Sequence, residues 1–203
     1  MSIPRQWFKD IQHALAVGPQ GPDSHGLSSV KRLYGACVCV NRDILLRHLE
    51  LGGEYFMSGR TSSGKITSGD DAELCEILKM HGYLLYYDRS LAFSHDIPSD
   101  RLAESYLSRL FDSFGDAFVS LLPYRLLGLP YGMGKILIRC PAMVRLVIRS
   151  YQMRLFLSNK SNFYKKCQNI MCRSARLSLR DSKKMRRNMQ VYGKLKELRV
   201  KLK

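Results

Sequence analysis

The spacing of apolar residues predicts two helices in the first half of the chain. The first extends over residues 43–49, where Asn41 can cap the opening turn. The second begins near Asp70, with apolar residues at intervals of three and four, and Gly82 closes it. Two helices of ordinary length therefore divide a stretch that otherwise consists of loops and strands.

Strand-like runs surround these helices. Small, apolar and β-branched residues predict strands over residues 34–40, 83–87 and 91–95. Residues 57–68 are rich in Gly, Ser and Thr and predict a loop, and a further helix is expected over about residues 100–122. This order of elements is typical of the C-terminal part of an α/β domain.

The pattern changes after about residue 120. In residues 117–157, apolar residues alternate with arginines, so a helix there would have a broad apolar face and a cationic border. A polybasic segment follows over residues 160–203. We therefore expect an α/β domain over residues 1–120 and a basic, amphipathic, helical region over residues 121–203.

Charge separates the same two parts. Residues 1–120 carry 12 Lys and Arg and 15 Asp and Glu, net −3, whereas residues 121–203 carry 21 basic and 2 acidic residues, net +19. Arginines interrupt every long apolar stretch, so no membrane-spanning helix is expected. The excess charge favours attachment to an anionic membrane surface. A helix packed on the domain with a solvated basic tail, or nonspecific contact with nucleic acid, would use the same residues.

The stretch from Gly69 to Arg101, GDDAELCEILKMHGYLLYYDRSLAFSHDIPSDR, contains an acidic pair that opens a helix, a Gly-Tyr turn and a strand that ends in His. This order resembles the family 2 glycosyltransferases of the GT-A fold. Shorter upstream matches resemble a bacterial subgroup that acts in surface-polysaccharide synthesis: Trp7-Phe8, Ala16-Val17-Gly18, Gln20, Tyr34-Gly35-Ala36, Gly59-Arg60 and Ser68-Gly69. The resemblance implies an incomplete GT-A-like, Rossmann-like domain.

The resemblance also implies roles for individual residues. Asp71 would be the general base that accepts the proton of the attacking hydroxyl, and Asp70 and Glu73 would shape and support the acceptor site. Gly35 and Ala36 would line that site. Without the resemblance, the three acids are explained by the helix dipole, and the two small residues by a tight strand end.

Two further residues would handle the leaving diphosphate. Arg101 would bind phosphate, and His95 would ligate the Mg²⁺ or Mn²⁺ ion expected for the complete enzyme, or contact the phosphate itself. Structural roles are the alternatives: His95 as a satisfied histidine at a strand end, and Arg101 in an ion pair with Asp100 or Glu104.

The predicted function is transfer of a sugar from a nucleotide-sugar to a saccharide or lipid-linked acceptor. The chain before Trp7 is too short for the nucleotide-binding half of such enzymes, and no DxD motif occurs, so we expect that half on another chain or in a missing segment. An inactive remnant or interaction module and a basic nucleic-acid-binding protein are the alternatives, and no specific nucleic acid is expected. Without a secretory signal, the expected location is cytoplasmic, at the inner face of the cell membrane.

Overall fold

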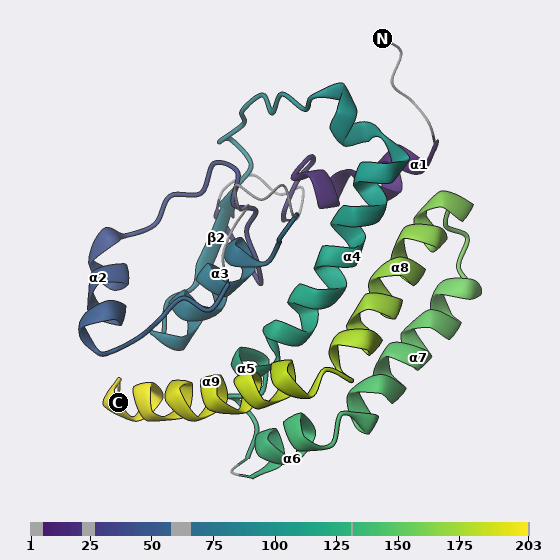
Figure 1. Cartoon of the computed structure of the whole chain (residues 1–203). Helices are drawn as coiled ribbons and strands as arrows, with labels where there is room; N and C mark the ends of the chain where they lie inside the picture. The colour runs from purple at the N-terminus through teal and green to yellow at the C-terminus, as the bar shows by residue number, and fades with distance from the viewer. Residues whose placement is uncertain (1–5, 22–26, 58–65, 131, 203) are drawn as a thin grey trace.

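Helices dominate the architecture, with a small sheet at one side (Figure 1). The computed structural model describes residues 6–21, 27–57, 66–130 and 132–202. In chain order the elements are α1 (Gln6–Ile11), η1 (Gln12–Leu15), β1 (Leu27–Val30), α2 (Arg42–Glu50), α3 (Asp70–Met80), β2 (Leu85–Asp88), η2 (Ser99–Leu102), α4 (Glu104–Ser120), α5 (Leu122–Arg125), α6 (Met133–Arg139), α7 (Ala142–Phe156), α8 (Asn162–Ser178) and α9 (Ser182–Lys201).

The described residues form one sheet, in which β1 and β2 pair antiparallel, from Leu27 opposite Asp88 to Val30 opposite Leu85. The sheet and the inner faces of α2 and α3 enclose a small cluster of buried side chains: Ile44, Cys75, Leu78 and Leu85. The predicted mixture of α and β structure is thus confirmed, with helices predominating. The finer expectation of a GT-A-like domain stays a prediction.

Both predicted helices of this part are present as α2 and α3. Asn41 caps α2, because its side-chain oxygen accepts a hydrogen bond from the backbone N–H of Asp43 at 2.8 Å. Gly82 follows α3 with a φ of 85°. The predicted loop over residues 57–68 is irregular at residues 66–68, and residues 58–65 lie outside the described part.

The strand predicted over residues 34–40 is wrong. Cys37 has a φ of 57°, which turns the chain out of an extended path. Val38 and Val40 line a pocket against Leu74 of α3 instead of joining a ladder. A run of small and β-branched residues therefore packs on a helix.

The strand predicted over residues 91–95 is also wrong, and the run at residues 83–87 forms only β2. The turn between the two runs exists, since Asp88 accepts a hydrogen bond from the backbone N–H of Ser90 at 2.8 Å. Beyond it, Leu91 and Phe93 are exposed and the segment has no ladder. β2 pairs instead with β1, which lies in a stretch where no strand was predicted.

The predicted helix over residues 100–122 corresponds to η2 and α4. α4 lies alongside α8 over most of its length (Figure 1). Gly115 permits this close approach, because a Cβ at that position would overlap the backbone oxygen of Met171. Leu107 and Phe111 of α4 are buried with Cys167 of α8.

The C-terminal part is helical, as expected, but its helices are shorter than the sequence suggested. Residues 117–157 are divided among the end of α4, α5, α6 and α7, with breaks near Pro130 and Pro141. The polybasic segment contains α8 and α9, whose apolar faces are buried. None of the described helices is both long and apolar enough to cross a membrane.

Residues from both sides of position 120 share the two larger clusters of buried side chains. Ile77 of α3 is buried with Tyr192 of α9, and Ile11 of α1 is buried with Cys167 of α8. α9 crosses beneath α5 and contacts α6 as well (Figure 1). The division at residue 120 stays a prediction, but the basic segment is part of the core.

Candidate functional site

The start of α3 fixes the positions of Asp70 and Asp71. Gly69, just before the helix, has a φ of 107°, a conformation that favours glycine. A Cβ there would also lie 2.6 Å from the Met57 side chain. The backbone oxygen of Gly69 accepts the first helical hydrogen bond, from the N–H of Glu73 at 2.7 Å. The two carboxylates therefore project from the first turn of a well-defined helix.

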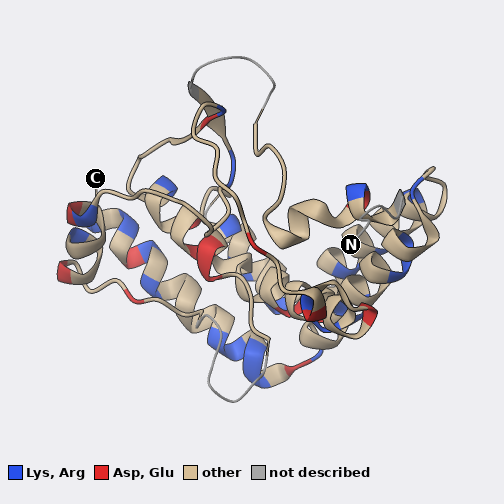
Figure 2. Cartoon of the chain, turned by 90° about the horizontal axis from the view of Figure 1, so that it is seen from above, with Lys and Arg blue, Asp and Glu red and all other residues tan. Residues whose placement is uncertain are grey.

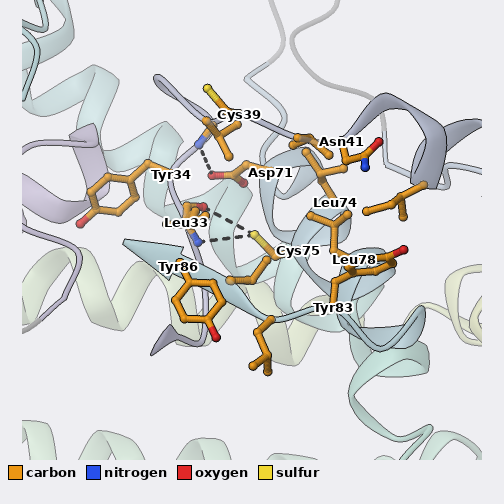
Figure 3. A pocket seen from close by; sticks show the side chains of 16 residues that line it. Leu33, Tyr34, Cys39, Asn41, Asp71, Leu74, Cys75, Leu78, Tyr83 and Tyr86 are labelled. Carbon is orange, nitrogen blue, oxygen red and sulfur yellow. Dashed lines mark hydrogen bonds between the residues drawn. The ribbon is translucent and has the colours of Figure 1, made fainter. Parts of the chain in front are cut away.

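Asp71 contacts the segment that precedes α2. Its Oδ2 accepts a hydrogen bond from the backbone N–H of Gly35 at 3.4 Å, and its Oδ1 accepts one from Ala72 at 2.7 Å. Figure 3 shows the Gly35 bond as a dashed line. A Cβ on Gly35 would lie 3.2 Å from the Cβ of Asp71, so the missing side chain permits the approach. A carboxylate has about four acceptor positions, so Asp71 can still accept a proton.

An open groove of about 770 Å³ lies beside this carboxylate. Its walls come from α1 and η1, the start of α3, and the facing sides of α4 and α8. Six of the residues singled out in the sequence line it: Asp70, Asp71, Gly35, Ala36, His95 and Arg101. Their proposed roles stay predictions, but the fold brings these residues to one place.

A smaller pocket of about 290 Å³ lies on the other side of Asp71. Asp71, Tyr34 and Gly35 line both cavities. The remaining wall is mostly apolar, with Leu74 and Tyr83 among the side chains in Figure 3. Asp71 therefore stands between a wide groove that contains charged side chains and a narrower, mostly apolar pocket.

Two arginines in the groove were not identified from the sequence. Arg125 of α5 is partly buried, with its guanidinium carbon 4.8 Å from the centre of the Phe118 ring. Burial lowers the pKa of Arg125, and the positive charge of Arg32 lowers it further. Both remain cations near neutral pH, so an anion bound near them would relieve their repulsion. Arg32 and Arg125 lie far apart in the sequence, and no local motif connects them.

His13 and Tyr34 form a second feature that the sequence did not reveal. His13 Nδ1 lies 2.6 Å from the hydroxyl of Tyr34, and both residues line the groove. The side chain of Gln20 accepts a hydrogen bond from the backbone N–H of Tyr34. Burial raises the pKa of the Tyr34 hydroxyl, so this group stays protonated. The available signal was that Gln20 and Tyr34 both belong to the short upstream matches.

His95 and Arg101 reach the groove from the segment between β2 and α4. His95 is exposed, with its ring centre 6.2 Å from that of Phe93, and it lies in no strand. Arg101 is partly buried in η2. Glu104, one suggested ion-pair partner of Arg101, instead pairs with Lys166 of α8.

Glu73 does not line the groove. It is fully buried, and its carboxylate accepts hydrogen bonds from the backbone N–H groups of Phe56 and Met57 at 2.9 and 2.8 Å. The hydroxyl of Tyr124 in α5 donates a third, at 2.6 Å. Burial and the Glu73 charge raise the pKa of Tyr124 well above its usual range. Glu73 supports the start of α3 from behind the site.

The described residues contain no group of three or more His, Cys, Asp or Glu that could hold a metal ion. His95 is the candidate ligand named from the sequence, and it lies at an exposed edge of the groove. The described side chains therefore do not fit a complete metal site, and no step proposed below passes through a metal.

Comparisons with protein-family models, with curated proteins and with solved structures find no match for this chain. The structure itself defines a mostly helical protein with a small antiparallel sheet and a groove lined by carboxylates, arginines and histidines. A function must therefore be argued from the groove.

Proposed function

We propose that this chain forms the acceptor-side part of an inverting, family 2-like glycosyltransferase, with Asp71 as the general base. One observation carries the proposal: six of the seven residues to which the resemblance assigns a role, all but Glu73, line one groove, although they come from separate segments. A role at the helix dipole alone would explain the acids at the start of α3. It would not explain why Gly35, His95 and Arg101 gather around the same cavity.

The proposed reaction is a displacement at the anomeric carbon of the donor. A hydroxyl of the acceptor attacks that carbon, the bond to the diphosphate breaks on the opposite side, and Asp71 accepts the hydroxyl proton. The hydrogen bond from Gly35 and the position in the first turn of α3 orient the carboxylate. An acceptor hydroxyl would have to come within about 3 Å of Asp71.

The arginines suit the leaving diphosphate. Arg32, Arg101 and Arg125 line the same groove as Asp71. Guanidinium groups bind phosphate oxygens through paired hydrogen bonds and offset the charge that develops on them. A divalent cation held elsewhere in a complete enzyme would add to this effect. Because the sequence has no DxD motif, we expect a separate nucleotide-binding segment or chain to hold the donor.

The proposal can be tested without knowing the acceptor. The chain would be combined with a nucleotide-binding half, through restored upstream sequence or co-expression, and supplied with a panel of UDP-, dTDP- and GDP-sugars. We expect slow release of nucleoside diphosphate, because water can attack the anomeric carbon in place of the acceptor hydroxyl, and no turnover by the chain alone. Exchanging Arg125 for Met should lower turnover by about 10²-fold, whereas the same exchange at Arg149, on the outer side of α7, should not.

Equal turnover by the Arg125 and Arg149 variants would contradict the arginine role. Saccharide binding in the groove without turnover of any donor would identify the chain as a non-catalytic binding module. Tight binding of UDP by the chain alone would overturn the expectation of a separate nucleotide-binding half.

A further inference from the structure

The helix α7 is apolar on two opposite sides. Val144, Ile148 and Leu155 are buried, on the side that packs against α8. A second set of large apolar side chains is between 57% and 75% exposed, and we call it the α7 stripe: Met143, Leu146, Val147, Met153, Phe156 and Leu157. Packing within the chain explains only the buried side, so the α7 stripe needs another partner.

Positive charge surrounds the α7 stripe. Arg145, Arg149 and Arg154 belong to the same helix. Residues 121–180 contain twelve Lys and Arg and no Asp or Glu. Figure 2 shows Lys and Arg recurring along the helices of the molecule. The partner must therefore accept six apolar side chains and offer negative charge around them.

We propose that the α7 stripe docks on an anionic lipid bilayer, with α7 lying in the plane of the surface. Apolar side chains then enter the boundary of headgroups and acyl chains, and the arginines contact lipid phosphates. A second copy of the chain would bring like charges together at the same face, and a nucleic acid would leave the apolar side chains without a partner. The described helices cannot cross the bilayer, which agrees with surface docking.

The α7 stripe lies one helix away from the groove. The Tyr151 hydroxyl of α7 donates a hydrogen bond to the side chain of Gln168 in α8 at 3.2 Å, and Gln168 lines the groove. Docking through α7 is independent of the proposed sugar transfer. Where both hold, docking brings the groove close to acceptors carried by membrane lipids.

Vesicle binding of the full chain tests the docking. The chain should co-sediment with vesicles of phosphatidylglycerol and phosphatidylcholine, and binding should fall as salt rises. The double variant Leu146→Asp, Val147→Asp should bind about tenfold more weakly or worse, because two inserted side chains become charged. The matched control, Leu91→Asp with Val200→Asp, adds the same charge at two even more exposed apolar positions outside α7 and should lose much less binding.

Three further variants distinguish the contribution of charge from that of membrane insertion. Arg145→Gln and Arg149→Gln should each weaken binding about fivefold at low salt. Leu146→Trp should show a blue-shifted emission that brominated lipids quench when vesicles are added. Trp7, the single tryptophan of the chain, packs against Phe163 and should not respond.

Three results would overturn the proposal. One is equal vesicle binding by the Leu146→Asp, Val147→Asp variant and its matched control. Another is binding of the unaltered chain to pure phosphatidylcholine vesicles that is as strong as its binding to vesicles with phosphatidylglycerol. The third is light scattering that shows a dimer dependent on Leu146 and Val147, with no vesicle binding, which would make the α7 stripe an interface between two copies.

Discussion

Two regions of the molecule differ in how they are held together. The helical region, residues 104–201, contributes most of the two larger buried clusters, and long helices pack along each other. The mixed region, residues 27–103, has strands of four residues each and a cluster of only four buried apolar side chains. It nevertheless supplies Asp71, Gly35 and most other candidate site residues. The comparison teaches that most candidate site residues lie on the less packed region, supported by the helical one.

The basic C-terminal segment has two roles in this comparison. Its sequence predicts a basic region that attaches to an anionic membrane surface, and this attachment stays a prediction. Its other face forms core, since Leu179, Val191 and Leu195 are nearly inaccessible to solvent. α8 also supplies one wall of the groove, through Tyr164, Gln168 and Met171.

The largest effect is expected where the two regions meet. Glu73→Ala removes the carboxylate that accepts hydrogen bonds from Phe56, Met57 and Tyr124, and leaves those donors buried without a partner. We expect a loss of about 3–5 kcal/mol in the free energy of unfolding. Glu76→Ala, on the same helix and in an ion pair with the partly exposed Lys79, should cost less than about 1 kcal/mol. Urea denaturation measures both, and equal losses would show that the regions are not joined through Glu73.

A smaller effect should distinguish the packing of two helical glycines. Gly115→Ala would force α4 away from α8, and we expect a loss of about 1–3 kcal/mol. A Cβ added at Gly193 in α9 would meet no other atom within 4 Å, so Gly193→Ala should stabilise the helix by about 0.5–1 kcal/mol. Thermal unfolding of the two variants should shift in opposite directions. A Gly115→Ala variant that unfolds at the same temperature as the unaltered chain would contradict the close contact between α4 and α8.

The smallest effect concerns a histidine pair within the mixed region. His48 is fully buried, and its Nδ1 lies 3.2 Å from Nε2 of His81. Burial lowers the pKa of His48 from the ordinary value of 6.5. Burial also lowers the pKa of His81, and the charges of His48 and Arg47 lower it further. In the folded state, the neutral form of both rings is therefore favoured.

This pair makes stability depend on pH. Below about pH 6.5 the unfolded chain binds protons that the folded chain does not, so stability is full above that value and falls with further acidification. Urea denaturation should give a lower free energy of unfolding at about pH 5.5 than at about pH 7.5. His81→Gln should make this difference smaller. A free energy of unfolding that increases as the pH falls would contradict the lowered pKa values of the two histidines.

Local signals explain which elements the sequence could predict. The helices at α2 and α3 were found because their caps and apolar spacing lie within a few residues. Strands depend on a partner elsewhere in the chain, and neither the turn at Cys37 nor the pairing of β1 with β2 has a local signal. Two of the three predicted strands were therefore wrong, and β1 was missed.

The same distinction applies to the site. Asp70 and Asp71 are adjacent in the sequence at the start of a predicted helix, so a short motif identifies them as candidate site residues. Arg32 and Arg125 meet only in the folded chain, so neither attracted attention in the sequence. Glu73 was grouped with its acidic neighbours, but the helical turn directs it into the core.

The most direct test of the account compares the two neighbouring carboxylates. In the chain combined with a nucleotide-binding half, turnover of the Asp71→Asn and Asp70→Asn variants would be measured alongside donor affinity. The account predicts that Asp71→Asn lowers turnover by about 10²–10⁴-fold with little change in donor affinity, and that Asp70→Asn has a much smaller effect. An Asp71→Asn variant that turns over as fast as the unaltered chain would contradict the assignment of Asp71 as the general base.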